Sequence, residues 1–239
     1  MAGCIVDITE KKRLADLKHE FVYIVTHELR TPLTALKGAL DVLTMLMGKD
    51  LPRGVENMLD LAMQGSNRLM VLINDLLEVG KAESGAMQFH CSEQSVEQLL
   101  QNAIDTNKPY ADKNQVTFDL KKPKQDSLIN VDPGRFMQIM TNLLSNAAKF
   151  SRPEDIVSIE TEIRNGRVII SVTDHGRGIP EDFQSKIFQK FAQASHGIYG
   201  TGLGLSITKT MLEKMQGRIW FTSEAEKGSV FYLEFPQAI

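Results

Sequence analysis

The sequence has few cysteines and no long hydrophobic run, and these absences exclude several classes of protein. Among its 239 residues, Cys4 and Cys91 stand alone and form neither a metal-ligand spacing nor the disulfide framework of a secreted domain. No apolar run reaches the length of a membrane span, and the first residues lack the core of a signal peptide. We therefore expect this segment to be cytoplasmic, without membrane contact, and any membrane anchor of a longer natural protein to lie outside it.

An excess of positive charge is also missing. The net charge is −3, which gives no electrostatic basis for binding nucleic acid, because nucleic-acid-binding proteins normally carry a basic face. The chain is 42% hydrophobic and 24% charged, the composition of a globular protein. Its length suits one large domain or two ordinary ones.

The stretch from Phe21 to Thr34 (FVYIVTHELRTPLT) predicts an amphipathic helix with a histidine on its polar side. Its apolar residues recur at three- and four-residue steps, and His27 falls off that stripe. Glu28 is adjacent to the histidine, and Thr31 follows one turn further along on the same face. A solvent-facing imidazole beside a carboxylate suggests chemistry, although an isolated surface histidine on a helix more often has no functional role.

The hydrophobic period continues on both sides of a predicted turn at residues 48–54, which indicates a helical hairpin. The second amphipathic run begins near Val55 and ends at a break between Gly80 and Gly85. A hairpin alone cannot bury both of its apolar stripes, so we expect two chains to pair into a four-helix bundle. The alternative is that the hairpin packs on the remainder of its own chain.

Beyond Gly85 the pattern predicts a second domain, an α/β sandwich whose mixed sheet is covered on one face. The predicted strands are residues 87–91, 116–120, 128–131, 157–163, 167–174, 218–223 and 229–235. The predicted helices are residues 95–111, 133–149 and 201–215. The Asn165-Gly166 pair predicts a tight hairpin turn between two of the strands.

The helix predicted after Asp132-Pro133 places three polar side chains on one face. Asn142, Asn146 and Lys149 follow at four- and three-residue steps. An amide oxygen is a hard ligand suited to Mg²⁺, and a lysine one turn further along is placed for a phosphate. By themselves these residues are equally compatible with a solvated helix face.

Two glycine-rich turns add further candidates. In the first, Asp174 precedes Gly176 and Gly178; its carboxylate can accept a hydrogen bond from an exocyclic amine, and the glycines let the backbone approach a flat base. The second turn directs free N–H groups of a helix N-terminus at phosphate. It lacks the ending of a Walker loop, and each turn alone is only a glycine-rich turn. Its residues are Gly200, Thr201, Gly202, Leu203 and Gly204.

Taken in order, five motifs resemble the H, N, G1, F and G2 boxes of bacterial sensor histidine kinases. They are THELRTPLT, NLLSNAAKF, DHGRGIP, FQKF and GTGLGL, and the resemblance covers nearly the whole chain. It implies a transmitter core with a histidine kinase/Hsp90-like ATP-binding domain, for which ATP and Mg²⁺ are the cofactors. VDIT at residues 6–9 is similar to the end of a PAS sensor domain, so an upstream sensor would be absent from this sequence.

The resemblance also implies a role for each matching residue. His27 would be phosphorylated, Glu28 would orient its imidazole and take its proton, and Thr31 would act in dephosphorylation of the partner. Asn146 would hold Mg²⁺, with Asn142 and Lys149 beside the triphosphate. Asp174 would bind the adenine amino group, Gly176 and Gly178 would line the base, and the residues from Gly200 to Gly204 would surround the phosphates. Phe188 and Phe191 would pack the hinge of a lid, although they are equally compatible with ordinary core aromatics.

The family pattern divides the chain into three parts. Residues 1–19 would be the end of a sensor linker and a signalling helix, residues 20–85 the dimerisation and phosphotransfer hairpin, and residues 86–239 the catalytic ATP-binding domain. The expected partners are a second copy of the chain and the receiver domain of a response regulator. Two positions depart from the family: His175 replaces the more usual Asn or Thr, and the lid contains no Arg or Lys, so cationic help at the γ-phosphate would rest on Lys149.

Other functions remain open at this point. A chaperone-like or mismatch-repair-like ATPase of the same nucleotide fold would share the Asn, Asp and Gly elements, but it would not need His27 in its HELRTP setting. A scaffold with degenerate boxes is opposed by the intact Asn146, Asp174 and glycines. A transmitter that acts mainly as a phosphatase would retain Glu28 and Thr31.

Overall fold

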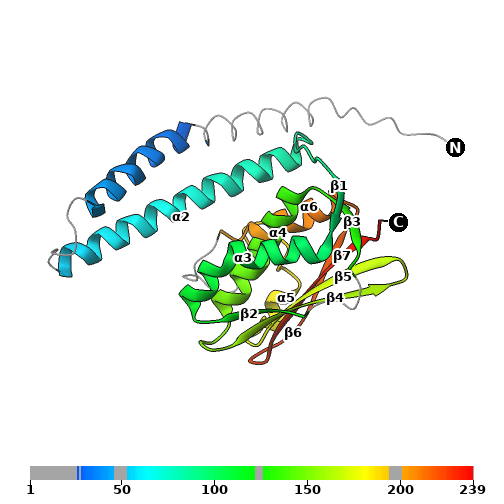
Figure 1. Cartoon of the computed structure of the whole chain (residues 1–239). Coiled ribbons are helices and arrows are strands. Elements are labelled where there is room, and N and C mark those ends of the chain that lie inside the picture. Colours follow the sequence, from blue (N-terminus) through cyan, green and yellow to red (C-terminus); the bar gives the residue numbers. More distant parts are fainter. Residues whose placement is uncertain (1–25, 27, 46–52, 122–125, 194–200, 239) are drawn as a thin grey trace. The chain divides into compact units, whose positions relative to one another are not determined.

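The computed structural model describes residues 26, 28–45, 53–121, 126–193 and 201–238. The chain divides into two compact units, Met1–Met87 and Gln88–Ile239, each of which is described by itself (Figure 1). Within the described ranges, no helix is both long and apolar enough to cross a membrane. The expected sensor linker, residues 1–19, lies outside the described residues.

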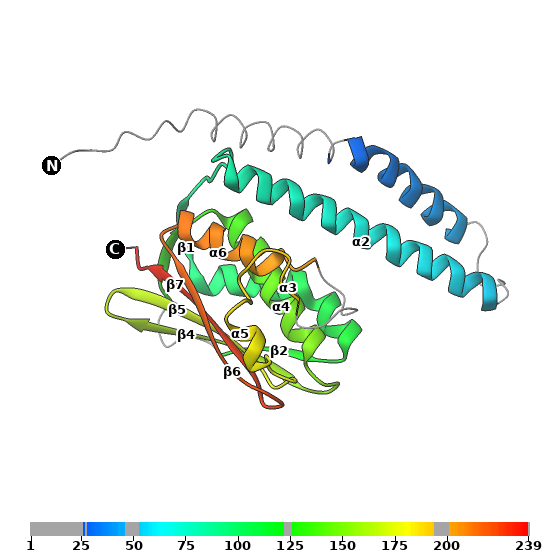
Figure 2. The same ribbon diagram turned by 180° about the vertical axis from the view of Figure 1, so that it is seen from behind.

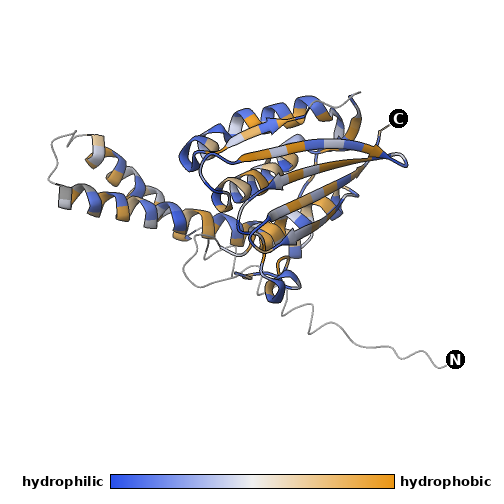
Figure 3. Ribbon diagram, turned by 90° about the horizontal axis from the view of Figure 1, so that it is seen from below, coloured by the Kyte–Doolittle hydropathy of each residue, from blue (hydrophilic) through white to orange (hydrophobic). Residues whose placement is uncertain are grey.

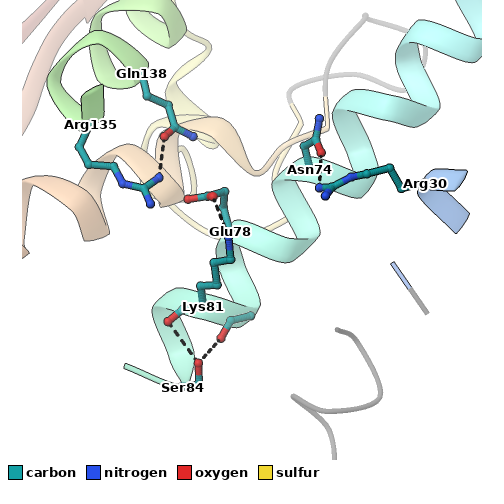
Figure 4. A network of polar contacts seen from close by, with 8 residues as sticks. Arg30, Asn74, Glu78, Lys81, Ser84, Arg135 and Gln138 are labelled. Atoms are coloured by element: carbon teal, nitrogen blue, oxygen red, sulfur yellow. Dashed lines mark hydrogen bonds and ion pairs between the residues drawn. The ribbon is translucent and has the colours of Figure 1, made fainter. Parts of the chain in front are cut away.

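The first unit is a helical hairpin, as predicted. Residues 28–45 are helical, and helix α2 spans Arg53–Glu83. Two contacts show that these helices are antiparallel. Arg30 donates a hydrogen bond to Asn74 Oδ1 at 2.7 Å (Figure 4), and Thr44 Oγ1 lies 3.6 Å from Met63 Sδ. Figure 3 shows hydrophobic and hydrophilic residues interleaved along α2.

The hairpin buries only part of its apolar surface. On α2, Ser66, Ile73 and Leu77 are buried, and Leu33 and Leu40 are buried on the first helix. Other large apolar side chains of the unit are exposed to solvent in the single chain, namely Leu29, Leu36, Val42, Leu43, Met45, Val55, Met58, Leu61, Leu69 and Val71. The hairpin therefore retains an apolar surface that its own described residues do not cover.

The second unit is the expected α/β sandwich. Its described helices are α3 (Val96–Asn114), α4 (Pro133–Phe150), α5 (Glu181–Gln184) and α6 (Gly204–Lys214). Its described strands are β1 (Ser92–Ser95), β2 (Thr117–Leu120), β3 (Leu128–Val131), β4 (Ile156–Arg164), β5 (Arg167–Asp174), β6 (Arg218–Glu224) and β7 (Gly228–Pro236).

The strands form a mixed sheet in the order β2-β4-β5-β7-β6 and a small sheet of β1 and β3. Only the β2–β4 pair of the larger sheet is parallel. Figures 1 and 2 show α3, α4 and α6 together on one face of this sheet. Every second side chain of β5 is buried. Successive side chains of a strand point to opposite faces of the sheet, so one set points toward the face that these helices cover.

The predicted hairpin turn is present, and the chain end reinforces it. Asn165 and Gly166 both have positive φ, 53° and 70°, which suits the tight turn between β4 and β5. Gln237 N donates to Gly166 O at 3.0 Å, and Ala238 N donates to Leu128 O at 2.8 Å. The last described residues thus connect the larger sheet to the smaller one.

Several elements differ from the sequence predictions. The strand predicted at residues 87–91 is wrong: the polar segment Ser92–Ser95 forms β1 instead, because its backbone pairs with β3. Helix α6 begins at Gly204 rather than residue 201, since Gly202 has a φ of +72° that a right-handed helix excludes. The one-turn helix α5 was not predicted; it follows Pro180 and has no side-chain cap.

Candidate functional site

Helix α4 carries several residues of the candidate site. Asp132 caps its first turn by accepting a hydrogen bond from Arg135 N at 3.0 Å, and Pro133 occupies the first position. Partial burial raises the pKa of Asp132, but hydrogen bonds from the backbone nitrogens of His90, Arg135 and Gly134 outweigh it, and the net pKa is lowered. The apolar face of α4 is buried, and the predicted polar face carries Asn142, Asn146 and Lys149, all half-buried.

Asn142 connects α4 to α6. Its Nδ2 donates a hydrogen bond to Thr208 Oγ1 at 3.0 Å, and its Oδ1 accepts one from Asn146 Nδ2 at 3.4 Å. A Cβ placed on Gly204 would collide with Asn142 Oδ1, so the first turn of α6 packs directly on this amide. The structure therefore brings together three of the predicted residues, Asn142, Asn146 and Gly204.

Asp174 lies at the end of β5 and is only 6% exposed. Its Oδ1 accepts a hydrogen bond from Gly176 N at 3.0 Å, and Ser229 on the neighbouring strand β7 also donates to it. Burial raises the pKa of the Asp174 carboxyl, and these hydrogen bonds oppose the increase without cancelling it. A buried acceptor of this kind is suited to a partner that supplies its own N–H group.

The turn after Asp174 packs on the end of α4. A Cβ on Gly176 would collide with the carbonyl oxygen of Phe150, and a Cβ on Gly178 with that of Glu224. The Phe150 ring has two cations near it, with Lys149 Nζ 4.7 Å and Arg177 Cζ 4.6 Å from its centroid. Asn142 and Phe150 are about 12 Å apart along the axis of α4, so this helix spans from the Asn pair to the Asp174 turn.

The second glycine turn is partly described. Gly200 lies outside the described residues, whereas Thr201 Oγ1 accepts a hydrogen bond from Leu203 N at 3.1 Å. The Gly202 backbone lies against the backbone of Phe191 and Ala192. Leu203 is 1% exposed and precedes the first turn of α6, which anchors the turn in the core.

The two predicted hinge aromatics have different surroundings. Phe188 packs edge-on against Phe221 of β6, with ring centroids 5.9 Å apart. Phe191 is 63% exposed and has a φ of +63°, which is unusual for a residue with a side chain. Phe191 is therefore not a core aromatic. Its positive φ turns the backbone after Phe188.

The predicted phosphorylation site belongs to the first unit. His27 lies outside the described residues. Its neighbours Glu28 and Thr31 are described, helical and exposed to solvent. Both side chains are therefore accessible on the surface of the hairpin.

The comparisons with known proteins match parts of the first and second units to two different families. Residues 17–85 match the His Kinase A (phospho-acceptor) domain, and residues 131–239 match the family of histidine kinase-, DNA gyrase B-, and HSP90-like ATPases. The circadian input-output histidine kinase CikA of Synechococcus elongatus is 34% identical over 226 residues, which cover 92% of this chain and 30% of that protein. The chain belongs to the sensor histidine kinases.

Further relatives agree with this assignment. The sensor histidine kinase WalK of Bacillus subtilis is 32% identical over 246 residues, which cover 99% of this histidine kinase and 39% of WalK. Full-length ShkA, crystallised with AMPPNP, superimposes with a TM-score of 0.73 at 27% identity, covering 92% of this chain and 46% of that one. The catalytic domain of ThkA superimposes with a TM-score of 0.55 at 29% identity, covering 63% of this chain and 97% of that domain. The chain spans less than half the length of CikA and WalK.

Some residues of this histidine kinase site could not be found from the sequence. Ser229 reaches Asp174 only because the β5–β7 register places them opposite one another. Thr208 is a single hydroxyl on the buried face of α6, with no motif of its own. Phe150 belongs to the recognised NLLSNAAKF motif, but its contact with Arg177 depends on the tertiary fold.

The residues on α4 fit a magnesium ion that also binds phosphate. Among the described residues, no three His, Cys, Asp or Glu side chains gather as a metal site. Magnesium does not need such a cage, because it commonly takes one or two protein oxygens and completes its shell with phosphates and water. Asn146 fits this role: its Nδ2 is bonded to Asn142, and within the described chain its Oδ1 receives no hydrogen bond.

Proposed function

We propose that this chain is the transmitter core of a sensor histidine kinase that uses Mg-ATP to phosphorylate His27 and then passes the phosphoryl group to an aspartate of a response regulator. One observation carries the proposal: the phospho-acceptor match over residues 17–85 contains His27, in the same chain as an ATPase-type domain. A chaperone-like or mismatch-repair-like ATPase needs no such phospho-acceptor domain, so the comparisons favour the kinase.

The nucleotide would lie along α4. Asp174 would accept a hydrogen bond from the adenine amino group, and Gly176 and Gly178, which pack on the backbone carbonyls of Phe150 and Glu224, would line the base. Asn146 would hold Mg²⁺ through Oδ1, and Lys149 would face the phosphates with the first turn of α6. When bound, magnesium would neutralise charge that develops on the phosphates during transfer.

The phosphoryl transfer would proceed in two balanced steps. First, a neutral imidazole nitrogen of His27 attacks the γ-phosphorus, an N–P bond forms, the bond from the γ-phosphorus to its bridging oxygen breaks, and ADP leaves. Glu28 takes the imidazole proton. Next, a carboxylate oxygen of the regulator's aspartate attacks the phosphorus, the N–P bond breaks, the imidazole takes a proton back and leaves as neutral His27, and an acyl phosphate forms. Thr31 would act in a separate reaction, the hydrolysis of the acyl phosphate that dephosphorylates the regulator.

The domain roles follow from this chemistry. Residues 1–19 would connect to a PAS-like sensor outside this chain, residues 20–85 would dimerise and carry His27, and residues 86–239 would bind ATP. The exposed apolar side chains on one side of the hairpin, such as Met58 and Leu69, support pairing with a second copy, because a four-helix bundle would cover them. The segment would function in the cytoplasm.

The direct test is incubation of the full chain with Mg²⁺ and γ-labelled ATP. We expect wild type to acquire a label that is lost in acid and kept in alkali, as is typical of a phosphoramidate, and His27→Gln to acquire none. A receiver domain added afterwards should take up the label. An unlabelled wild type that still binds nucleotide would overturn the kinase proposal and favour a phosphatase or a scaffold, which a regulator dephosphorylation assay would separate.

A further inference from the structure

We infer that Thr208 is a positioning residue, which acts through Asn142 to hold the Asn146 amide with its oxygen toward the metal. The inference rests on the proposed function, because it assumes that Asn146 Oδ1 is a magnesium ligand. It assigns a role to a hydroxyl on α6 that belongs to none of the five motifs.

The three side chains form a continuous series of hydrogen bonds between two helices. Asn142 Nδ2 donates to Thr208 Oγ1 at 3.0 Å, and Asn146 Nδ2 donates to Asn142 Oδ1 at 3.4 Å. Thr208 is 2% exposed, so its hydroxyl has no water to replace Asn142 as a partner. The buried end of the series is therefore fixed in α6.

The direction of the series determines which atom Asn146 presents. An asparagine amide has one acceptor end and one donor end, so engaging Nδ2 of Asn142 with Thr208 leaves its Oδ1 for Asn146. Asn146 then uses Nδ2 in this contact and presents Oδ1 on its other side. If Asn142 were rotated by half a turn, its Nδ2 would face Asn146 Nδ2, two donors would meet, and Asn146 would have to turn its oxygen inward.

Loss of the Thr208 hydroxyl removes the group that accepts from Asn142 Nδ2 in the observed orientation. In Thr208→Val, Asn142 Nδ2 would face a methyl group, and a half-buried amide donor that loses its partner is unfavourable. The amide would turn its nitrogen toward Asn146 instead. The oxygen of Asn146 would then be used within the protein, and the metal would lose a ligand, although every residue of the recognised motifs is unchanged.

The test measures binding rather than turnover, in the full-length chain. The dissociation constant of ATP is obtained by displacement of the fluorescent analogue TNP-ATP, once in excess Mg²⁺ and once in EDTA. The ratio of the two constants gives the contribution of the metal. The hydroxyl-free variants are Thr208→Val and Thr208→Ala; Thr208→Ser keeps the hydroxyl, and Thr210→Val is a matched control because the Thr210 hydroxyl bonds only Ser206 O of its own helix, at 3.0 Å.

We expect both hydroxyl-free variants to lose about 10-fold in ATP affinity in Mg²⁺, the lower end of the effect of removing an outer partner of a metal ligand, and to keep wild-type affinity in EDTA. Thr208→Ser and Thr210→Val should resemble wild type in both conditions. The Mg²⁺ concentration for half-maximal phosphorylation should rise in parallel. Two hydroxyl-free variants are used so that the test stands if one of them does not fold, as judged by circular dichroism.

Three results would overturn the inference, and they can be distinguished. If wild type gains affinity from Mg²⁺ and a folded hydroxyl-free variant gains as much, Thr208 does not position Asn146, and the proposed function is unaffected. Equal loss of affinity in Mg²⁺ and in EDTA would likewise show a structural role only. If wild type itself gains nothing from Mg²⁺, the assignment of Asn146 as a metal ligand fails, and the inference fails with it.

Discussion

The backbone of Gly202 packs directly on the backbone of Phe191: a Cβ on Gly202 would lie 2.7 Å from the carbonyl carbon of Phe191. Both residues have positive φ, +72° and +63°. Two chain positions that are well separated in sequence therefore meet at the start of α6. This contact leaves no room for a side chain at Gly202.

Gly202→Ala should weaken ATP binding and destabilise the second unit, because the new methyl group meets backbone atoms that cannot move independently. Positive φ alone costs an alanine about 1–2 kcal/mol, and the collision adds to it. Gly166→Ala is the matched control, since Gly166 has a φ of +70° and no atom within 4 Å of an added Cβ. We expect Gly166→Ala to lose stability but not ATP affinity. Equal ATP affinity in both variants would show that the Gly202 contact does not shape the site.

Asp174→Asn should weaken ATP binding by about tenfold, because an amide replaces an ionised acceptor whose hydrogen bonds are worth about 1.5–3 kcal/mol. TNP-ATP displacement measures the change, with the exposed Asp119→Asn as control. A variant that binds ATP like wild type would exclude Asp174 as the adenine acceptor.

The Asp174 carboxyl also predicts a pH dependence. Burial raises its pKa above 3.8, so its ionised form is lost as pH falls through the raised pKa, and the affinity advantage of wild type over Asp174→Asn should shrink there. Stability changes in the opposite direction: the contribution of this group is complete below about pH 3.8 and is lost as pH rises through the raised pKa. Parallel binding and unfolding titrations of both proteins would measure these opposite trends.

Asp132→Ala should lower the stability of the second unit by about 1 kcal/mol, because it removes the cap of α4. The net lowered pKa of Asp132 means that its contribution is complete above pH 3.8 and is lost as pH falls through the lowered pKa. The difference from wild type should therefore shrink in acid. Asp132→Asn should keep most of the cap without this acid dependence.

Urea unfolding followed by Trp220 fluorescence measures the effect at Asp132, since this single tryptophan lies in β6 and reports on the second unit. A loss from Asp132→Ala that is constant through the acid range would contradict the assigned role of the ionised carboxylate.

Glutamate at both Met58 and Leu69 should weaken the proposed dimer at least about tenfold, because each would place an unpaired charge in the bundle interface. These side chains are 73% and 50% exposed in the single chain and lie on the same side of α2. Val71→Glu is the matched control: Val71 is 52% exposed but lies on nearly the opposite side of the helix. Sedimentation equilibrium should show weaker association only for the double variant. A similar loss for Val71→Glu would contradict the proposed interface.

The sequence predicted elements and motifs well where one local pattern governs them. The four-step spacing of Asn142 and Asn146 placed both on one face of α4, and Asn165-Gly166 produced the expected turn. Local rules were less successful where pairing with distant strands decides the structure. The polar β1 is a strand only because β3 supplies its partner. The pattern of apolar residues therefore predicted a strand at residues 87–91, just before the observed one.

The remainder of the site depends on contacts between elements. No spacing rule connects Asn142 with Thr208, because the two residues lie on different helices whose packing brings them together. Likewise, Ser229 is recognisable as a partner of Asp174 only from the strand register. The motifs therefore identified residues that are proposed to touch the nucleotide, but not the residues that hold them in place.

The hydrogen bonds of Gln237 to Gly166 and of Ala238 to Leu128 have a practical consequence for truncated or C-terminally tagged versions of this chain. A truncation after Pro236 would remove both bonds at once and weaken the connection between the small sheet and the larger one. The small sheet contains β1, which leads directly into α3. Deleting a few C-terminal residues would therefore loosen the packing of α3 against α4. Shortened versions with reduced activity should therefore be examined first for damaged architecture rather than for lost chemistry.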